Sequence, residues 1–197
     1  MNYTLSSLID MTKMQRLLDS FCDAMGTAAA IIDLEGEVLI ASRWQRICTH
    51  FHRTNDQTYE KCIESDTQLA NELQEGKPFS VYRCPNGLTD AASPIIIENE
   101  HMANAFAGQF FLKPPDQDFF ARQAARYGFD EAAYLDAVSQ VPIMDAKKLP
   151  AILNFLTTLA EITAVMGIDR LKQLEAEATL KEREEKLRTI IEHSNEL

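Results

Sequence analysis

Cysteine and histidine side chains are concentrated in one part of the chain. Cys48, His50, His52, Cys62 and Cys84 all fall between residues 48 and 84. Thiolates and imidazoles bind zinc and iron, so the three cysteines are candidate ligands of a metal or iron–sulfur centre, with a fourth ligand from one of the histidines. No two cysteines have the CxxC spacing of zinc ribbons and ferredoxins. Buried apolar thiols and a redox-active thiol pair therefore remain as alternatives.

Polar side chains interrupt the β-prone sequence of residues 82–111. An ordinary half-exposed strand alternates apolar and polar residues, because one face meets the core and the other meets water. Here Asn104 and Gln109 are mixed with Phe106 and Phe110. This pattern is expected where a sheet lines a cavity.

Motifs of the common enzyme classes are absent from the sequence. It contains no GxGxxG, GxxxxGK[ST], GxSxG or HExxH, so nucleotide binding, serine hydrolysis and zinc proteolysis have no support. His101 falls at a predicted turn, where a solvated histidine is expected, and His193 has no nucleophile or carboxylate at a meaningful spacing. We therefore do not expect this segment to be an enzyme.

Composition and charge narrow the class of protein further. The chain has 197 residues, 46% of them hydrophobic, and a formal net charge of -11, which suits one domain of roughly 150 residues plus an appendage. The negative charge argues against nucleic acid as a partner, because phosphates would be repelled. No run of eighteen apolar residues and no secretory signal is present, so we expect a cytoplasmic segment without membrane contact.

The periodicity of apolar residues predicts alternating helices and strands. Helices are expected over residues 5–25, 44–73 and 147–192, with two short ones between 116 and 142 split near Gly128. Strands are expected at AAAIID and EVLIAS, which form a hairpin, and at 79–83, 92–98 and 103–112. A turn is expected at Asn99, Glu100 and His101. In this arrangement the three cysteines should approach one another, with a pocket between the sheet and the helical segment carrying Cys48 and Cys62.

The last helix changes composition along its length. From Leu171 onward it consists mainly of Glu, Lys, Arg, Leu and Ala, a composition typical of coiled coils. One apolar seam contains Leu171, Leu174 and Ala178, and a second contains Leu180, Leu187 and Ile191, so a slip of the seam is predicted near Leu180. We expect a homodimer through this C-terminal helix.

The order of motifs resembles a known family. The segments around Cys48, "CIESD", "YRCPNGLTDAASPI" and "GQFF" closely resemble, in this order, the sensory domain of PocR, a regulator of propanediol utilisation. The resemblance covers roughly residues 8 to 165. It implies an α+β, PAS-like fold that senses small hydrocarbon derivatives such as diols. Domain boundaries of 1–166 for the sensory domain and 167–197 for a coiled-coil signalling helix follow.

The resemblance also implies a binding role for the polar strand residues. A PAS-like sheet buries one face around a small ligand, so Tyr82, Asn86, Asp90, Asn104 and Gln109 become candidates to hydrogen-bond it. The aromatic rings of Phe106 and Phe110 would supply apolar walls. Alternatively, Asn86 and Asp90 cap the turn "CPNGLTD".

A second resemblance lies at the end of the sequence. "EREEKLRTIIEHSNEL" is similar to the linker that opens a PAS domain in sensor histidine kinases and diguanylate cyclases. It implies that the chain is a fragment of a signal-transduction protein with a downstream PAS or output domain. The alternative function is a redox sensor, based on a metal or on thiols, that uses Cys48, Cys62 and Cys84.

Overall fold

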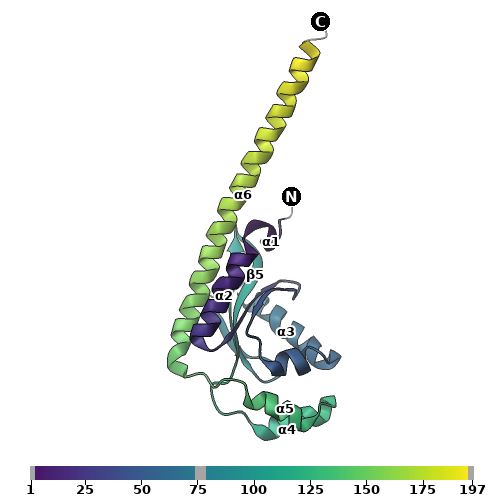
Figure 1. The fold of residues 1–197 in the computed structure, drawn as a ribbon, viewed down its shortest axis with the longest axis vertical. Coiled ribbons are helices and arrows are strands. Elements are labelled where there is room, and N and C mark those ends of the chain that lie inside the picture. Colours follow the sequence, from purple (N-terminus) through teal and green to yellow (C-terminus); the bar gives the residue numbers. More distant parts are fainter. Residues whose placement is uncertain (1–2, 74–78, 195–197) are drawn as a thin grey trace.

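Five antiparallel strands form the sheet around which the other elements pack (Figure 1). The computed structural model describes residues 3–73 and 79–194, and the side chains of 3–67 and 79–191. The strands are β1 (Ala28–Asp33), β2 (Val38–Ser42), β3 (Ser80–Arg83), β4 (Thr89–Ile97) and β5 (Glu100–Phe110). Their order is β2-β1-β5-β4-β3, so β1, β5 and β4 are central and β2 and β3 are the edges.

Helices precede, interrupt and follow the strands. They are α1 (Leu5–Leu8), α2 (Met11–Met25), the π-helical turn η1 (Cys48–His52), α3 (Asp56–Leu73), α4 (Gln117–Tyr127), α5 (Glu131–Ser139), the 3-10 turn η2 (Ala146–Lys148) and α6 (Leu149–Ser194). This arrangement confirms the α+β class, with an antiparallel sheet, flanking helices and a long C-terminal helix.

The two faces of the sheet are covered by different helices. On one face, α2 packs on β1 and β2 and α6 packs on β4 and β5, in a single core that includes Ala103, Ala105 and Ala107 of β5. The opposite face presents Ala92 and Phe106 and is covered by η1 and α3. Because side chains alternate along a strand, neighbouring residues of β5 belong to different cores. The central strands therefore touch both sets of helices.

The helix expected over residues 44–73 is interrupted, which corrects that prediction. A turn separates η1 from α3, and the Asn55 side chain stabilises it by capping α3. The Asn55 Oδ1 atom accepts hydrogen bonds from the backbone N–H groups of Gln57 and Thr58, at 3.1 and 3.3 Å. Asparagine is a preferred N-cap residue because its oxygen satisfies amides that have no partner within the helix. The break lets η1 and α3 cover different parts of the sheet.

Two other boundaries differ from expectation for the same kind of local reason. Asp10 caps α2 by accepting from the Lys13 backbone N–H at 3.0 Å, so the opening helix is divided into α1 and α2. The β4–β5 hairpin turns at Glu98 and Asn99, which have φ angles of 49° and 67°. Positive φ at both central residues is typical of a two-residue turn that matches strand twist. His101 consequently lies in β5, not in the turn.

The helices α4 and α5 build a second, separate core. Gly128 ends α4 with a φ of 70°, at the place where the sequence predicts the split. The Phe120 and Tyr134 side chains are fully buried with Ile47 and Leu88. This core therefore fixes η1 and the turn before β4, two segments that are far apart in the sequence.

The long helix α6 lies along the sheet and then extends well beyond it (Figure 1). Its first half is anchored by buried side chains including Ile152, Leu156 and Leu159. Gly167 allows close approach, because a Cβ atom there would lie 2.4 Å from Ile97 Cδ1. The second half is exposed, and residues 195–197 of the predicted signalling helix lie outside the described residues.

The apolar residues of the expected dimer seam divide between two faces of α6. Leu171 and Leu174 are partly buried against the core of their own domain. The apolar side chains that stay exposed on the helix include Ile162, Met166, Leu180, Leu187 and Ile191.

The apolar content of α6 also bears on the membrane prediction. By length and composition alone, a helix over residues 146–191 is apolar enough to cross a membrane, with 33% of its most apolar window buried inside the domain. The sequence shows no uninterrupted apolar run there because Thr157, Thr158 and Glu161 intervene. The buried part of the helix packs on the sheet, and an apolar core helix meets the same criterion.

We predict that packing of α6 on the sheet is a major source of stability. Leu156 is 0% exposed, so Leu156→Ala should lower the free energy of unfolding by about 2–5 kcal/mol. Val165 is 58% exposed on the same helix, and Val165→Ala should change it by less than about 0.5 kcal/mol. Urea denaturation of both variants tests this, and equal effects would contradict the packing of α6 described above.

Candidate ligand-binding site

A cavity of about 50 Å³ lies between the sheet and the covering segments η1 and α3. One water needs roughly 10–15 Å³ of such space, so the cavity has room for a few waters or for a ligand of a few heavy atoms. The residues that line it come from β1, β4, β5, the turn before β4, η1 and α3. They include Ala28, Ala30, Ile32, Trp44, Cys48, His52, Arg53, Cys62, Ser65, Asp66, Cys84, Asn86, Leu88, Asp90, Phe106, Gly108 and Gln109.

Small side chains on the sheet leave the space open. Ala28 and Ala30 of β1 lie beside Gly108 and Phe106 of β5, with which they pair. Larger residues at these positions would fill the volume with their own atoms. The small side chains at the start of β1 thus leave space for the cavity on one face of the sheet and allow close packing of helices on the other.

Gly108 makes room for the carboxyl group of Asp90. These two residues face each other across β4 and β5, and a Cβ atom on residue 108 would lie 1.9 Å from Asp90 Oδ1. The same Oδ1 atom accepts the backbone N–H of Gln109 at 2.9 Å. The glycine and the following amide therefore form a seat for this carboxyl group.

Gln109 occupies a strained position at the edge of the cavity. Its φ is 59°, a left-handed conformation that costs energy for a residue other than glycine. Its side-chain Oε1 accepts the backbone N–H of Gln45 at 2.5 Å. Gln109 thus links the sheet to the segment that leads into η1, and the strain is offset by hydrogen bonds at both ends of the residue.

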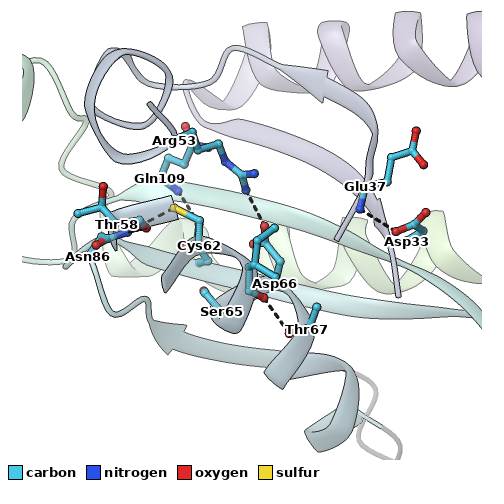
Figure 2. Close-up of polar contacts among 12 residues, drawn as sticks. Asp33, Glu37, Arg53, Thr58, Cys62, Ser65, Asp66, Thr67, Asn86 and Gln109 are labelled. Atoms are coloured by element: carbon cyan, nitrogen blue, oxygen red, sulfur yellow. Dashed lines mark hydrogen bonds and ion pairs between the residues drawn. The ribbon is translucent and has the colours of Figure 1, made fainter. Parts of the chain in front are cut away.

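The turn "CPNGL" holds Asn86 inside the protein. Gly87 N–H donates to the Cys84 carbonyl at 2.8 Å, and Cys84 N–H donates to the Leu88 carbonyl at 2.7 Å. Gly87 has a φ of 106° and lies against Phe119, so this position requires glycine. Asn86 is only 1% exposed. Its Nδ2 donates to the Thr58 carbonyl at 2.9 Å and to Cys62 Sγ at 3.3 Å (Figure 2).

An ion pair lies on the side of the cavity formed by η1 and α3. Arg53 donates to Asp66 Oδ2 at 2.6 Å (Figure 2), and its guanidinium lies 4.4 Å from the centre of the Trp44 ring. Both charged side chains are mostly buried, with 16% and 11% exposed. Burial raises the pKa of Asp66, whereas the nearby Arg53 charge opposes this shift. The pair carries the two permanent opposite charges at the cavity, and they compensate each other.

His52 belongs to a buried polar network and not to a metal site. Its Nε2 lies 2.7 Å from the Tyr134 hydroxyl, and Gln123 Nε2 contacts both groups as well as the Asn86 carbonyl. Burial, followed by the charge of Lys61, lowers the pKa of His52 to about 3. The imidazole is therefore neutral and serves to tie η1 to α4 and α5.

The three predicted cysteines do come to one cavity, but as protonated thiols. Burial is the main cause that raises the pKa of Cys62 to about 11 and that of Cys48 and Cys84 far above the usual range. Within the described residues, no group of three His, Cys, Asp or Glu side chains could hold a metal ion. His50 is exposed and bonds Thr49 through Nδ1 at 2.8 Å. The predicted metal set of Cys48, Cys62, Cys84 and His50 therefore finds no support in this geometry, and the three thiols contribute to the lining of the cavity.

The other predicted residues divide between the cavity and its surroundings. Asn86, Asp90, Phe106 and Gln109 line it. Tyr82 lies behind the lining and bonds the Ser65 hydroxyl at 2.8 Å.

Two predicted contacts fall outside the cavity. Asn104 is fully buried near the same face of the sheet, but its Oδ1 is bound to His101 at 2.8 Å. Phe110 lies in the core on the opposite face, which corrects its predicted role. The left-handed Gln109 and the register shift between Thr89 and Asp90 interrupt the alternation that placed Phe110 beside Phe106.

Sequence reasoning missed the charged residues of the site. Asp66 follows Cys62 by four residues, hence on the same helix face, and an acid among Thr58, Cys62 and Ser65 was a usable signal. No sequence pattern identifies Arg53 or Trp44 as site residues. The orientation of their side chains depends on the break between η1 and α3, which the sequence does not predict.

Comparison with known families supplies one further finding. The family model described as the sensory domain found in PocR matches residues 7–168. That span contains every lining residue of the cavity and ends within α6. The search among curated proteins gave no match.

We predict a pH-dependent stability that originates at Asp90. Burial raises the pKa of its carboxyl from 3.8 to about 7, although the Gln109 N–H opposes this shift. The folded state thus favours the protonated form, so the stabilisation is complete below about pH 4 and is lost as the pH rises through about 7. The loss has a limiting slope of about 1.4 kcal/mol per pH unit. Asp90→Asn, which cannot ionise, should remove this component.

Urea denaturation between pH 4.5 and 8 measures the effect. The variant should gain stability relative to the unmodified chain as the pH rises. Glu64→Gln, a change at an exposed site on α3, controls for the loss of one negative charge. Parallel curves for Asp90→Asn and the unmodified chain would contradict the prediction.

Proposed function

The chain belongs to the family of sensory domains found in PocR, and from this premise we propose that it binds a small organic ligand, such as a short alcohol or diol, in the cavity between the sheet and η1 and α3. The observation that carries the proposal is the cavity itself. It combines apolar walls from Ala28, Ala30 and Phe106 with polar groups from Asn86 and Asp90. Apolar walls with a few placed polar groups are typical of small-molecule sites.

The size of the cavity limits the affinity. At a ceiling near -1.5 kcal/mol per heavy atom, a five-atom diol gains at most about -7.5 kcal/mol, which corresponds to micromolar or weaker binding. Such affinity suits a sensor of a metabolite present at micromolar to millimolar concentration. It also requires that the few hydrogen bonds be well placed.

The central strands offer a route from the cavity to α6. Asp90 of β4 lines the cavity and Ala92 packs on the same side of the sheet. Ala91 and Ile95 of the same strand face the helices on the other side. A shift of β4 or β5 on ligand binding would therefore change the packing of α6. The ligand can drive this shift only if it binds two arrangements with different affinity.

We place this module in the cytoplasm, upstream of an output domain of the sensor histidine kinase or diguanylate cyclase type. The extended second half of α6 supports this view, because its exposed, charged sequence suits a connection between domains. The module itself would bind and transmit and would not catalyse a reaction.

A homodimer through α6 completes the proposal. Ile162 and Leu180 are separated by 18 residues, about five turns of helix, and Met166, Leu180 and Leu187 recur at multiples of seven residues. All are exposed by 41–59%. These four residues lie on one face of the helix, with Leu171 and Leu174 on another, and Gln173 is a polar position of the same face between Met166 and Leu180. A second copy would bury this face in a coiled coil.

Diol binding is tested by filling the cavity. Calorimetric titration should show that propane-1,2-diol binds the unmodified chain and binds Ala30→Val at least about tenfold more weakly, because the two added carbons occupy the site. Ala41 pairs with Ala30 on β2 but is exposed, so Ala41→Val should keep the affinity. Unchanged binding to Ala30→Val would place the ligand elsewhere.

The dimer is tested at two positions of α6 that face opposite directions. Leu180→Arg should convert the dimer to a monomer in light scattering, because a charge would be buried in the seam. Ala178→Arg, at an exposed position of the same helix turned away from the seam, should leave the dimer intact. A monomeric unmodified chain, or equal effects of the two changes, would refute the seam.

A further inference from the structure

The orientation of the Asn86 amide is fixed by its neighbours. The Thr58 carbonyl can only accept a hydrogen bond, so the group that contacts it at 2.9 Å must be the Nδ2 donor. The same nitrogen also contacts Cys62 Sγ at 3.3 Å. Rotating the amide by half a turn would set two oxygen acceptors against each other. The Oδ1 atom therefore points away from the Thr58 carbonyl and from Cys62 Sγ.

This Oδ1 atom is a buried acceptor without a donor. It receives no hydrogen bond from the described part of the chain, in a side chain that is 1% exposed and lines the cavity. An unsatisfied buried acceptor costs roughly 1–3 kcal/mol. A donor that enters the cavity removes this cost, so the position rewards a ligand that carries an O–H or N–H group.

The charges around the cavity disfavour ions of either sign. A carboxylate would need a free cation, but Arg53 is already engaged by Asp66 at 2.6 Å. An ammonium ion would need a free carboxylate oxygen, but Asp66 Oδ2 is paired with Arg53 and Asp90 Oδ1 already accepts the Gln109 amide. An ion of either sign would therefore lose its hydration in the cavity without an opposite charge of its own. His52 offers no charge, since its ring is bound to Tyr134 and neutral.

We propose that Asn86 Oδ1 accepts a hydrogen bond from an uncharged hydroxyl group of the ligand, so that the cavity selects neutral hydroxylated molecules over carboxylates and ammonium ions of the same size. This inference rests on the proposed function and specifies its ligand chemistry. It makes Asn86 the residue that reads the hydroxyl group, with Thr58 and Cys62 as its positioning partners.

Three probes with a three-carbon skeleton test the selection on the unmodified chain: propane-1,2-diol, propanoate and propylammonium. In ¹⁵N-labelled protein at pH 7, the diol should shift the Asn86 side-chain amide signal, which is identified by its absence in Asn86→Asp. The diol should bind at least about tenfold more tightly than either ion, since one hydrogen bond of about 1.4 kcal/mol is worth a factor of ten.

A variant pair adds a second readout. Asn86→Ala should weaken diol binding about tenfold, whereas Asn154→Ala, at an exposed position on α6, should not change it. If Asn86→Ala does not fold, the comparison of probes on the unmodified chain decides.

The outcomes separate the two proposals. Equal or tighter binding of an ion, or diol binding that leaves the Asn86 signal unmoved, overturns this inference and leaves the proposed function standing. Binding of none of the three probes overturns both.

Discussion

The buried carboxyl group of Asp90 is the constraint on which the site depends. A carboxyl group inside a protein needs space and donors, and the chain supplies them through Gly108, which leaves room, and the Gln109 N–H, which donates. To present that amide, Gln109 adopts a left-handed conformation. The consequences spread from this point: the strand register shifts, Phe110 turns to the opposite face, and the Gln109 side chain reaches Gln45 at the start of the covering segment.

Much of the fold follows from the sequence because it depends on local rules. Apolar periodicity and the break at Gly128 predict the order of helices and strands, and the polar residues between 82 and 111 indicate a sheet that lines a cavity. The failures have two causes. The break at Asn55 is set by a local cap, which apolar periodicity does not record. The bulge at Gln109 depends on the pairing of β4 with β5, and the ion pair of Arg53 with Asp66 joins the end of η1 to α3. Periodicity within one segment does not record contacts between elements.

The helix α6 illustrates the same limit at larger scale. Its heptad pattern contains two superimposed apolar stripes, and the sequence alone merges them into one seam with a slip. In the structure Leu171 and Leu174 are partly buried against the domain core, whereas Leu180 and Leu187 remain exposed. In the sequence, an apolar stripe that packs inside the chain has the same periodicity as one that is available to a partner. Only the packing of α6 on the sheet shows which stripe is buried within the domain.

One sheet therefore carries two functions that would conflict on a single face. The cavity needs small residues and compensated polar groups, while α6 needs continuous apolar packing. Alternation of side chains along β4 and β5 separates these requirements by one residue: Ala92 and Phe106 belong to the cavity side, and Ala91 and Ala105 to the helix side. Because the backbone between them is shared, a displacement of the strand at Asp90 moves both faces together. Because Gly167 of α6 packs tightly against Ile97 of β4, a displacement of this strand would also move α6.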